Sequence, residues 1–180
     1  MLEKLADWAR PVLDFPYIRR TRRNHGLEHA TVHILASRVK KTRMAGRSSE
    51  GGFVIIGNLT KDQIEKAAHD ALQRMRDGEH DLAVHPNCGT NLVTTGALTT
   101  LTGWVGLGGS NNRFDLNRIS WTMTLMIFAV LFSQPLGMKL QRHFTTEGDP
   151  GDLEIISVNE RPSRWPFQDL KVHFVSTRRG

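Results

Sequence analysis

The chain has 180 residues, carries a formal net charge of +6 at pH 7, and contains a single cysteine. This length suits one domain with a sizeable core, or one soluble domain with an added membrane segment. One cysteine excludes an intrachain disulfide, so the fold does not depend on an oxidising compartment. The N-terminal segment is charged throughout and lacks the continuous apolar run of a secretory signal peptide, so we expect no such signal.

The basic residues form two clusters, at residues 19–23 and 40–43. Such clusters can bind nucleic acid or anionic lipid headgroups, or can simply form a solvated surface. Neither aromatic interleaving nor a known reader motif accompanies these two. We therefore expect a lipid bilayer as the partner, with a solvated surface as the alternative, and no nucleic acid.

Two helices are predicted in the first 42 residues. The apolar residues of segment 2–15 recur at helical spacing, which predicts an amphipathic helix bent near Pro11. This helix could lie in a membrane interface or pack on the domain core. Segment 24–42 predicts a second helix with Asn24 as its N-cap. Its polar stripe consists of His25, Glu28, His29 and His33.

A third helix has the clearest local signals. Thr60 and Gln63 form a capping box, which predicts the helix start, and Gly78 is expected to end the helix. Its buried face is predicted to consist of Ile64, Ala67, Ala68, Ala71, Leu72 and Met75.

Short apolar runs predict the strands. Residues 44–52 are rich in glycine and serine and predict a turn-rich connection instead. The strands are predicted at residues 53–56, 81–84, 153–158 and 170–175. We expect them to join in one small sheet.

Two further segments lack charge and predict membrane helices. Residues 119–138 are long enough to cross the hydrocarbon core. Residues 92–107 are apolar but rich in threonine and glycine, and small residues let membrane helices pack closely. If both cross, they form a hairpin whose flanking parts, which hold most of the lysine and arginine, face the cytoplasm. The alternative is a soluble protein with a buried helical hairpin.

The polar stripe of the second helix predicts metal chemistry. His25 and His29 project from one face of the helix, and two imidazoles at that spacing can share one ion, usually zinc. With Glu28 between them, they have the order H-x-x-E-H of the inverted zincins, in which the glutamate deprotonates a metal-bound water. His85 and Cys88 can supply further ligands from a polar turn downstream.

We therefore predict four metal ligands, His25, His29, His85 and Cys88, with Glu28 as the catalytic base, zinc as the ion and no other cofactor. Two histidines, one thiolate and a water would make an open, catalytic site, whereas four protein ligands would make a closed, structural one. In the alternative without a metal role, Glu28 is only an acid favoured by the helix dipole, and Cys88 is only a small buried side chain.

Three blocks of sequence resemble the YqhQ-like family of predicted metal-dependent bacterial membrane proteins. The blocks are His25-Gly26-x-Glu28-His29, then His85-Pro86-x-Cys88-Gly89-Thr90, then Leu140-Gln141 followed by Thr145-Thr146, Pro150 and Leu153-Glu154. The chain is also similar to uncharacterised cyanobacterial and Chloroflexi-type proteins that share these blocks. It departs from the YqhQ-like pattern in being short and in having Asn91-Leu92 after the second block. The resemblance implies a metal site and a membrane setting, but no established substrate.

The predicted fold is α+β: a small sheet with helices that carry the metal site, plus a two-helix apolar, transmembrane hairpin. Residues 1–90 and 139–180 are predicted to form the cytoplasmic domain, and residues 91–138 the hairpin. Two functions are compatible with this organisation. One is a zinc-dependent hydrolase at the cytoplasmic membrane surface. The other is a non-catalytic, metal-stapled protein that assembles with the membrane or with a membrane protein partner.

Overall fold

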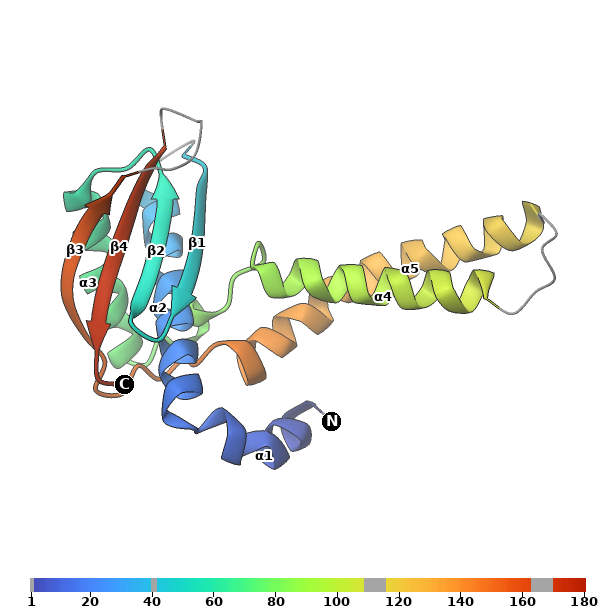
Figure 1. Cartoon of the computed structure of the whole chain (residues 1–180), viewed down its shortest axis with the longest axis horizontal. Helices are drawn as coiled ribbons and strands as arrows, with labels where there is room; N and C mark the ends of the chain where they lie inside the picture. Colours follow the sequence, from blue (N-terminus) through green and yellow to red (C-terminus); the bar gives the residue numbers. More distant parts are fainter. Residues whose placement is uncertain (1, 40–41, 109–115, 163–169) are drawn as a thin grey trace. The chain divides into compact units, whose positions relative to one another are not determined.

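The computed structural model describes residues 2–39, 42–108, 116–162 and 170–180. The chain divides into two compact units, one formed by Met1–His85 with Arg142–Gly180 and the other by Pro86–Gln141. Within the described residues, the fold has one four-stranded antiparallel sheet and five α-helices (Figure 1). The predicted α+β class is therefore confirmed.

The sheet lies in the first unit. Its strands follow the spatial order β1 (Met44–Ser49), β2 (Gly52–Gly57), β4 (Lys171–Arg178) and β3 (Glu154–Arg161), and all neighbours are antiparallel. Phe53 lies opposite Val175, and Ile55 lies opposite His173. All four side chains are fully buried. Because alternate residues share a face, these cross-strand pairs define the core side of the sheet.

Helices α2 (Pro16–Arg38) and α3 (Lys61–Arg76) cover that face (Figure 1). All six residues of the predicted buried face of α3 are buried. The capping box is also confirmed, since Thr60 Oγ1 accepts from the Gln63 N–H at 3.2 Å and the Thr60 N–H donates to Gln63 Oε1 at 2.8 Å. From α2, the core receives Leu27, Ala30, Ile34 and Leu35.

The start of α2 was predicted wrongly. The helix begins at Pro16, a residue favoured in the first helical turn, and not at Asn24. Asn24 lies inside the helix and is buried. Its Nδ2 donates to the carbonyls of Ser49 and Glu50 at 2.9 Å each, and its Oδ1 accepts from Thr177 Oγ1 at 2.8 Å. Asn24 therefore joins α2 to the sheet. The end predicted for this helix includes residues 40–41, which lie outside the described residues.

Two other local predictions were wrong. Residues 44–49, predicted as a connection, form strand β1, whose ladder partner β2 compensates for its weak strand propensity. Residues 81–84, predicted as a strand, lie mainly in the 3₁₀-helix η1 (His80–Ala83) and pack against α2. The predicted strands at 53–56, 153–158 and 170–175 are confirmed within one sheet, and residues 81–84 are not part of it.

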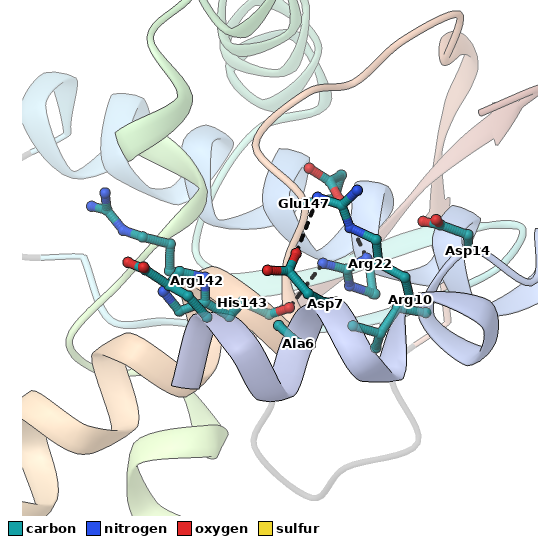
Figure 2. Close-up of a pocket in the computed structure, with 10 residues that line it drawn as sticks. Ala6, Asp7, Arg10, Asp14, Arg22, Arg142, His143 and Glu147 are labelled. Atoms are coloured by element: carbon teal, nitrogen blue, oxygen red, sulfur yellow. Dashed lines mark hydrogen bonds and ion pairs between the residues drawn. The ribbon is translucent and has the colours of Figure 1, made fainter. Parts of the chain in front are cut away.

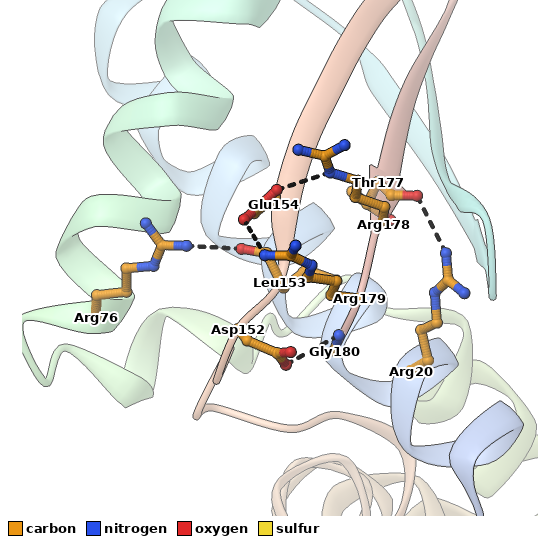
Figure 3. A network of polar contacts seen from close by, with 9 residues as sticks. All are labelled: Arg20, Arg76, Asp152, Leu153, Glu154, Thr177, Arg178, Arg179 and Gly180. Atoms are coloured by element: carbon orange, nitrogen blue, oxygen red, sulfur yellow. Dashed lines mark hydrogen bonds and ion pairs between the residues drawn. The ribbon is translucent and has the colours of Figure 1, made fainter.

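Arginine side chains fasten the C-terminal strands to the helices (Figure 3). Arg76 of α3 donates to the carbonyl of Leu153 at 2.8 Å, immediately before β3. Arg20 of α2 donates to the carbonyl of Thr177 in β4 at 3.2 Å. The Arg20 bond joins α2, the helix that carries the predicted site, to the last strand of the chain.

The second unit contains helices α4 (Gly89–Leu107) and α5 (Leu116–Leu140). The π-helix η2 (Gln141–Thr145) follows α5, and only its first residue, Gln141, belongs to this unit. The two α-helices pack through small and polar residues. A Cβ added at Gly106 would collide with Thr122, and the hydroxyls of Thr95 and Ser133 share a hydrogen bond of 2.6 Å. Glycine thus permits the close approach of the two helices.

The large apolar side chains of α5 point outward. Its buried residues, Thr122, Ser133 and Gly137, are small or polar. Trp121, Leu131 and Phe132 are between 64% and 70% exposed. Among the described residues, one helical stretch, Leu116–Thr145, is long and apolar enough to cross a membrane by length and composition. A crossing by residues 92–107, and with it the two-helix hairpin, stays a prediction.

Candidate metal centre

Four histidines of the first unit lie side by side. The ring centroids of His25 and His29 are 4.4 Å apart, and those of His33 and His85 are 4.7 Å apart. The rings of His29 and His85 are separated by 5.9 Å. The helical spacing of His25, His29 and His33 sets three of these rings on one stripe of α2, and η1 brings His85 to that stripe.

Backbone carbonyls hold three of these rings in place. Nδ1 of His29 lies 2.8 Å from the Ala83 oxygen, and Nδ1 of His25 lies 2.9 Å from the Thr145 oxygen. A carbonyl can only accept, so each Nδ1 carries the proton and, in the neutral ring, Nε2 is the basic nitrogen. Metal-binding histidines in proteins are commonly oriented in this way.

His33 is held through its other ring nitrogen: Nε2, and not Nδ1, donates to a carbonyl, the Val84 oxygen at 2.9 Å. The 3₁₀-helix η1 thus ends in two successive carbonyls, of Ala83 and Val84, that orient rings on α2. The sequence contained no signal for this role, because a main-chain acceptor can be supplied by any residue type. The same segment was predicted as a strand, which would place these carbonyls differently.

The surroundings of His85 favour its neutral ring. The pKa of His85 is lowered to about 4, first because burial penalises the charged ring and then because charges on His33 and His29 would repel it. A metal ion requires the neutral imidazole, so protons compete little for His85 near neutral pH.

Glu28 lies on the adjoining face of α2, against β1. Its carboxylate accepts a short hydrogen bond from the Ser48 hydroxyl, and a Cβ added at Gly46 would collide with it. Burial raises the pKa of Glu28, whereas the Ser48 hydrogen bond and the charge of His25 oppose that rise. Its role as a base stays a prediction. Its position explains why β1 has glycine at residue 46.

Cys88 belongs to the second unit and lies three residues after His85 in the sequence. It is the N-cap of α4, where its Sγ accepts from the Thr90 N–H at 3.4 Å. The positive end of the helix dipole favours anionic sulfur at this position. Cys88 stays a predicted ligand for the histidine group of the first unit.

Sequence reasoning missed one buried charged residue beside this region. Arg22 has 8% of its surface exposed and donates to the carbonyls of His143 and Thr146 at 3.2 and 3.1 Å. It also pairs with Glu147 at 3.2 Å. This pair fixes the segment that carries the Thr145 carbonyl. Within a run of arginines, the sequence does not distinguish the buried member from the exposed ones.

The fold and this site define a class of small α+β protein with a histidine-lined helix, an apolar helix and a single cysteine. The profile of the family described as "Domain of unknown function (DUF6391)" matches residues 20–158, so the chain belongs to that family. An uncharacterized protein of Picosynechococcus sp. (strain ATCC 27264 / PCC 7002 / PR-6) is 31% identical over 138 residues. The match covers 69% of this chain and 65% of that protein. No solved structure matches. The expected cyanobacterial relatives are therefore confirmed.

Proposed function

We propose that this is a membrane-associated zinc-binding protein. The ligands are His25, His29, His85 and Cys88, and the ion is Zn²⁺ because imidazole nitrogen and thiolate sulfur are the donors that zinc prefers. The observation that carries the proposal is the contact of three ligand imidazoles within the first unit, with two of them oriented by carbonyl oxygens. The resemblance to the YqhQ-like proteins accords with it.

The enzymatic form of the proposal is a hydrolase at the cytoplasmic membrane surface. Zinc bound at such a site supplies Lewis-acid activation of water. Glu28 is the residue that would accept a proton, and the raised pKa of its buried carboxyl makes the carboxylate a better acceptor. His25 and His29 hold their rings in one tautomer without help from a substrate.

A specific observation favours the non-catalytic alternative. The Glu28 carboxylate is engaged by Ser48 beneath β1, as a structural acid would be. In this alternative the ion staples the chain, and the basic surface docks lipid or a membrane protein partner. Metal binding is common to both forms, whereas a catalytic Glu28 belongs to the first alone.

The membrane setting is supported by the outward-facing apolar side chains of α5. We infer that α5 crosses the bilayer and that α4 crosses beside it, to complete a hairpin of residues 91–138. The flanking parts, residues 1–90 and 139–180, carry most of the lysine and arginine and therefore face the cytoplasm.

Metal analysis of the purified full-length protein tests the proposal. We expect about one zinc per chain in the wild type, a loss of zinc in His29→Ala and His85→Ala, and full zinc in the control His69→Ala, since His69 is exposed on α3. Zinc retention by both site variants would contradict the proposal. Glu28→Gln then separates the two forms. If this variant keeps zinc but fails to complement a deletion of the gene, the hydrolase is supported. If it keeps zinc and also complements the deletion, the non-catalytic form is supported.

A further inference from the structure

Helix α1 (Leu2–Leu13) has an apolar stripe that nothing in the described first unit covers. Leu5, Trp8 and Val12 are 49%, 84% and 60% exposed, and α1 has no buried residue. Their spacing of three and four residues places them on one side of the helix. A helix of a soluble domain normally turns such a stripe toward the core.

Another side of α1 lines a pocket of the first unit. This pocket has a volume of about 360 Å³ and is lined by Ala6, Asp7 and Arg10 of the helix and by Asp14, which follows it (Figure 2). Across the pocket lie Arg22 and Glu147. The helix therefore turns a shallow side of small apolar and charged residues toward the pocket and leaves the stripe of Leu5, Trp8 and Val12 outward.

The residues around the stripe point to a lipid surface. Phe15, between α1 and α2, and Tyr17, in the first turn of α2, are 59% and 57% exposed. With Trp8, three aromatic side chains are therefore exposed within ten residues. Tryptophan and tyrosine favour the headgroup level of a bilayer. Arg19, Arg20 and Arg23 follow and are partly exposed, whereas Arg22 is buried. Basic residues beside an interface attract anionic headgroups.

We propose that α1 lies in the plane of the membrane interface, with Leu5, Trp8 and Val12 inserted at the acyl boundary of an anionic phospholipid leaflet. The proposal rests on the membrane association proposed above and gives it a second contact. If α5 crosses the bilayer, the chain continues directly from it into Arg142, so the first unit is tethered at the surface that α1 would enter.

Fluorescence of Trp8 in the full-length protein tests this proposal. The protein is reconstituted into phosphatidylglycerol-containing vesicles with and without brominated acyl chains, and the Trp8 signal is the difference between wild type and Trp8→Phe. We expect a blue-shifted Trp8 signal that bromine quenches. Val12→Glu should abolish this quenching. The matched control Ile156→Glu should not, because Ile156 is similarly exposed, at 55%, but lies on β3.

The tryptophans of the second unit distinguish failure of this proposal from failure of the proposed membrane association. If Trp8→Phe is still quenched through Trp104 and Trp121 while the difference signal is not, the chain is in the membrane and α1 is not. If no tryptophan is quenched, both proposals fail. A blue-shifted Trp8 signal that bromine does not quench would also overturn the inference, because protein and not lipid would then cover the stripe. If the blue shift of Trp8 depended on protein concentration, a second copy of the chain would cover the apolar stripe. If it did not, another part of the same chain would cover it.

Discussion

His33 and His85 lie with their ring centroids 4.7 Å apart, and His33 Nε2 donates to the carbonyl oxygen of Val84 at 2.9 Å. Val84 immediately precedes His85, so this bond positions the backbone from which His85 projects. His33 is therefore a residue that orients a proposed ligand, and the two roles can be separated by experiment.

We expect His33→Ala to weaken zinc binding about tenfold to a hundredfold while leaving the number of bound ions unchanged, because loss of an orienting hydrogen bond typically has an effect of this size. A chelator competition titration measures the affinity, with His69→Ala as the control. An affinity equal to that of the wild type would remove this role from His33. If His33→Ala lost zinc as completely as His29→Ala, His33 would itself be a ligand.

Gly46 in β1 and Gly51 in the turn that follows give a matched test of how Glu28 is packed. A Cβ at Gly46 would collide with the Glu28 carboxylate, whereas a Cβ at Gly51 would meet nothing within 4 Å. We expect Gly46→Ala to lower the free energy of unfolding by about 1–3 kcal/mol, since overpacking a filled site forces its neighbours to move. Gly51→Ala should change it by less than about 0.5 kcal/mol. Chemical denaturation followed by circular dichroism measures both, and equal effects would place the Glu28 side chain elsewhere.

The second unit offers a similar pair on α4. A Cβ at Gly106 would collide with Thr122 of α5, and a Cβ at Gly96 would meet nothing within 4 Å. Alanine should stabilise an open helical position by up to about 1 kcal/mol, so Gly96→Ala is expected to be neutral or stabilising. Gly106→Ala should lower the stability of the helix pair by about 1–3 kcal/mol. Thermal loss of helicity in detergent measures the difference, and the reverse ranking would contradict the observed packing of α4 on α5.

His173 gives a pH dependence whose sign follows from its burial. The side chain is fully buried on β4, and burial lowers its pKa, a shift that Lys171 adds to and Glu160 opposes. The unfolded chain therefore binds a proton below about pH 6.5 that the folded chain does not bind until a lower pH. Stability contributed by the neutral ring is thus present above that pH and is lost as the pH falls.

Replacing His173 by leucine should remove this component. Between about pH 7 and pH 5, we expect the unfolding free energy of His173→Leu to fall less steeply than that of the wild type. The exposed control His69→Leu should keep the wild-type slope. Urea denaturation at a series of pH values provides the comparison. Parallel slopes for wild type and His173→Leu would show that His173 is protonated as readily in the folded chain as in the unfolded one.

Much of the fold could be predicted where local signals and packing agree. Helix α3 combines a capping box at Thr60 with an apolar stripe, and both were found as predicted. Strand β1 could not be predicted, because its glycines and serines have low strand propensity and its order comes from pairing with β2. The prediction of Asn24 as a helix N-cap was wrong for a related reason. Its side chain is suited to capping, but tertiary partners on the sheet engage it within the helix.

The candidate site shows the same division. The spacing of His25 and His29 on one helix face is a property of the sequence, and their contact follows from it. The orienting oxygens of Ala83, Val84 and Thr145 depend on how distant segments meet, and backbone acceptors leave no compositional mark. The carboxylate of Glu28 lies against β1, a strand that was not predicted, so its surroundings could not be foreseen either.

X-ray absorption at the zinc edge of the purified full-length protein tests the central claim most directly. The proposed ligand set predicts nitrogen neighbours at about 2.0–2.1 Å and a sulfur neighbour at about 2.3 Å. The sulfur component should disappear in Cys88→Ser, and the nitrogen component should decrease in His29→Ala. A shell made only of oxygen, or a spectrum that neither substitution changes, would contradict a metal centre built from His25, His29, His85 and Cys88.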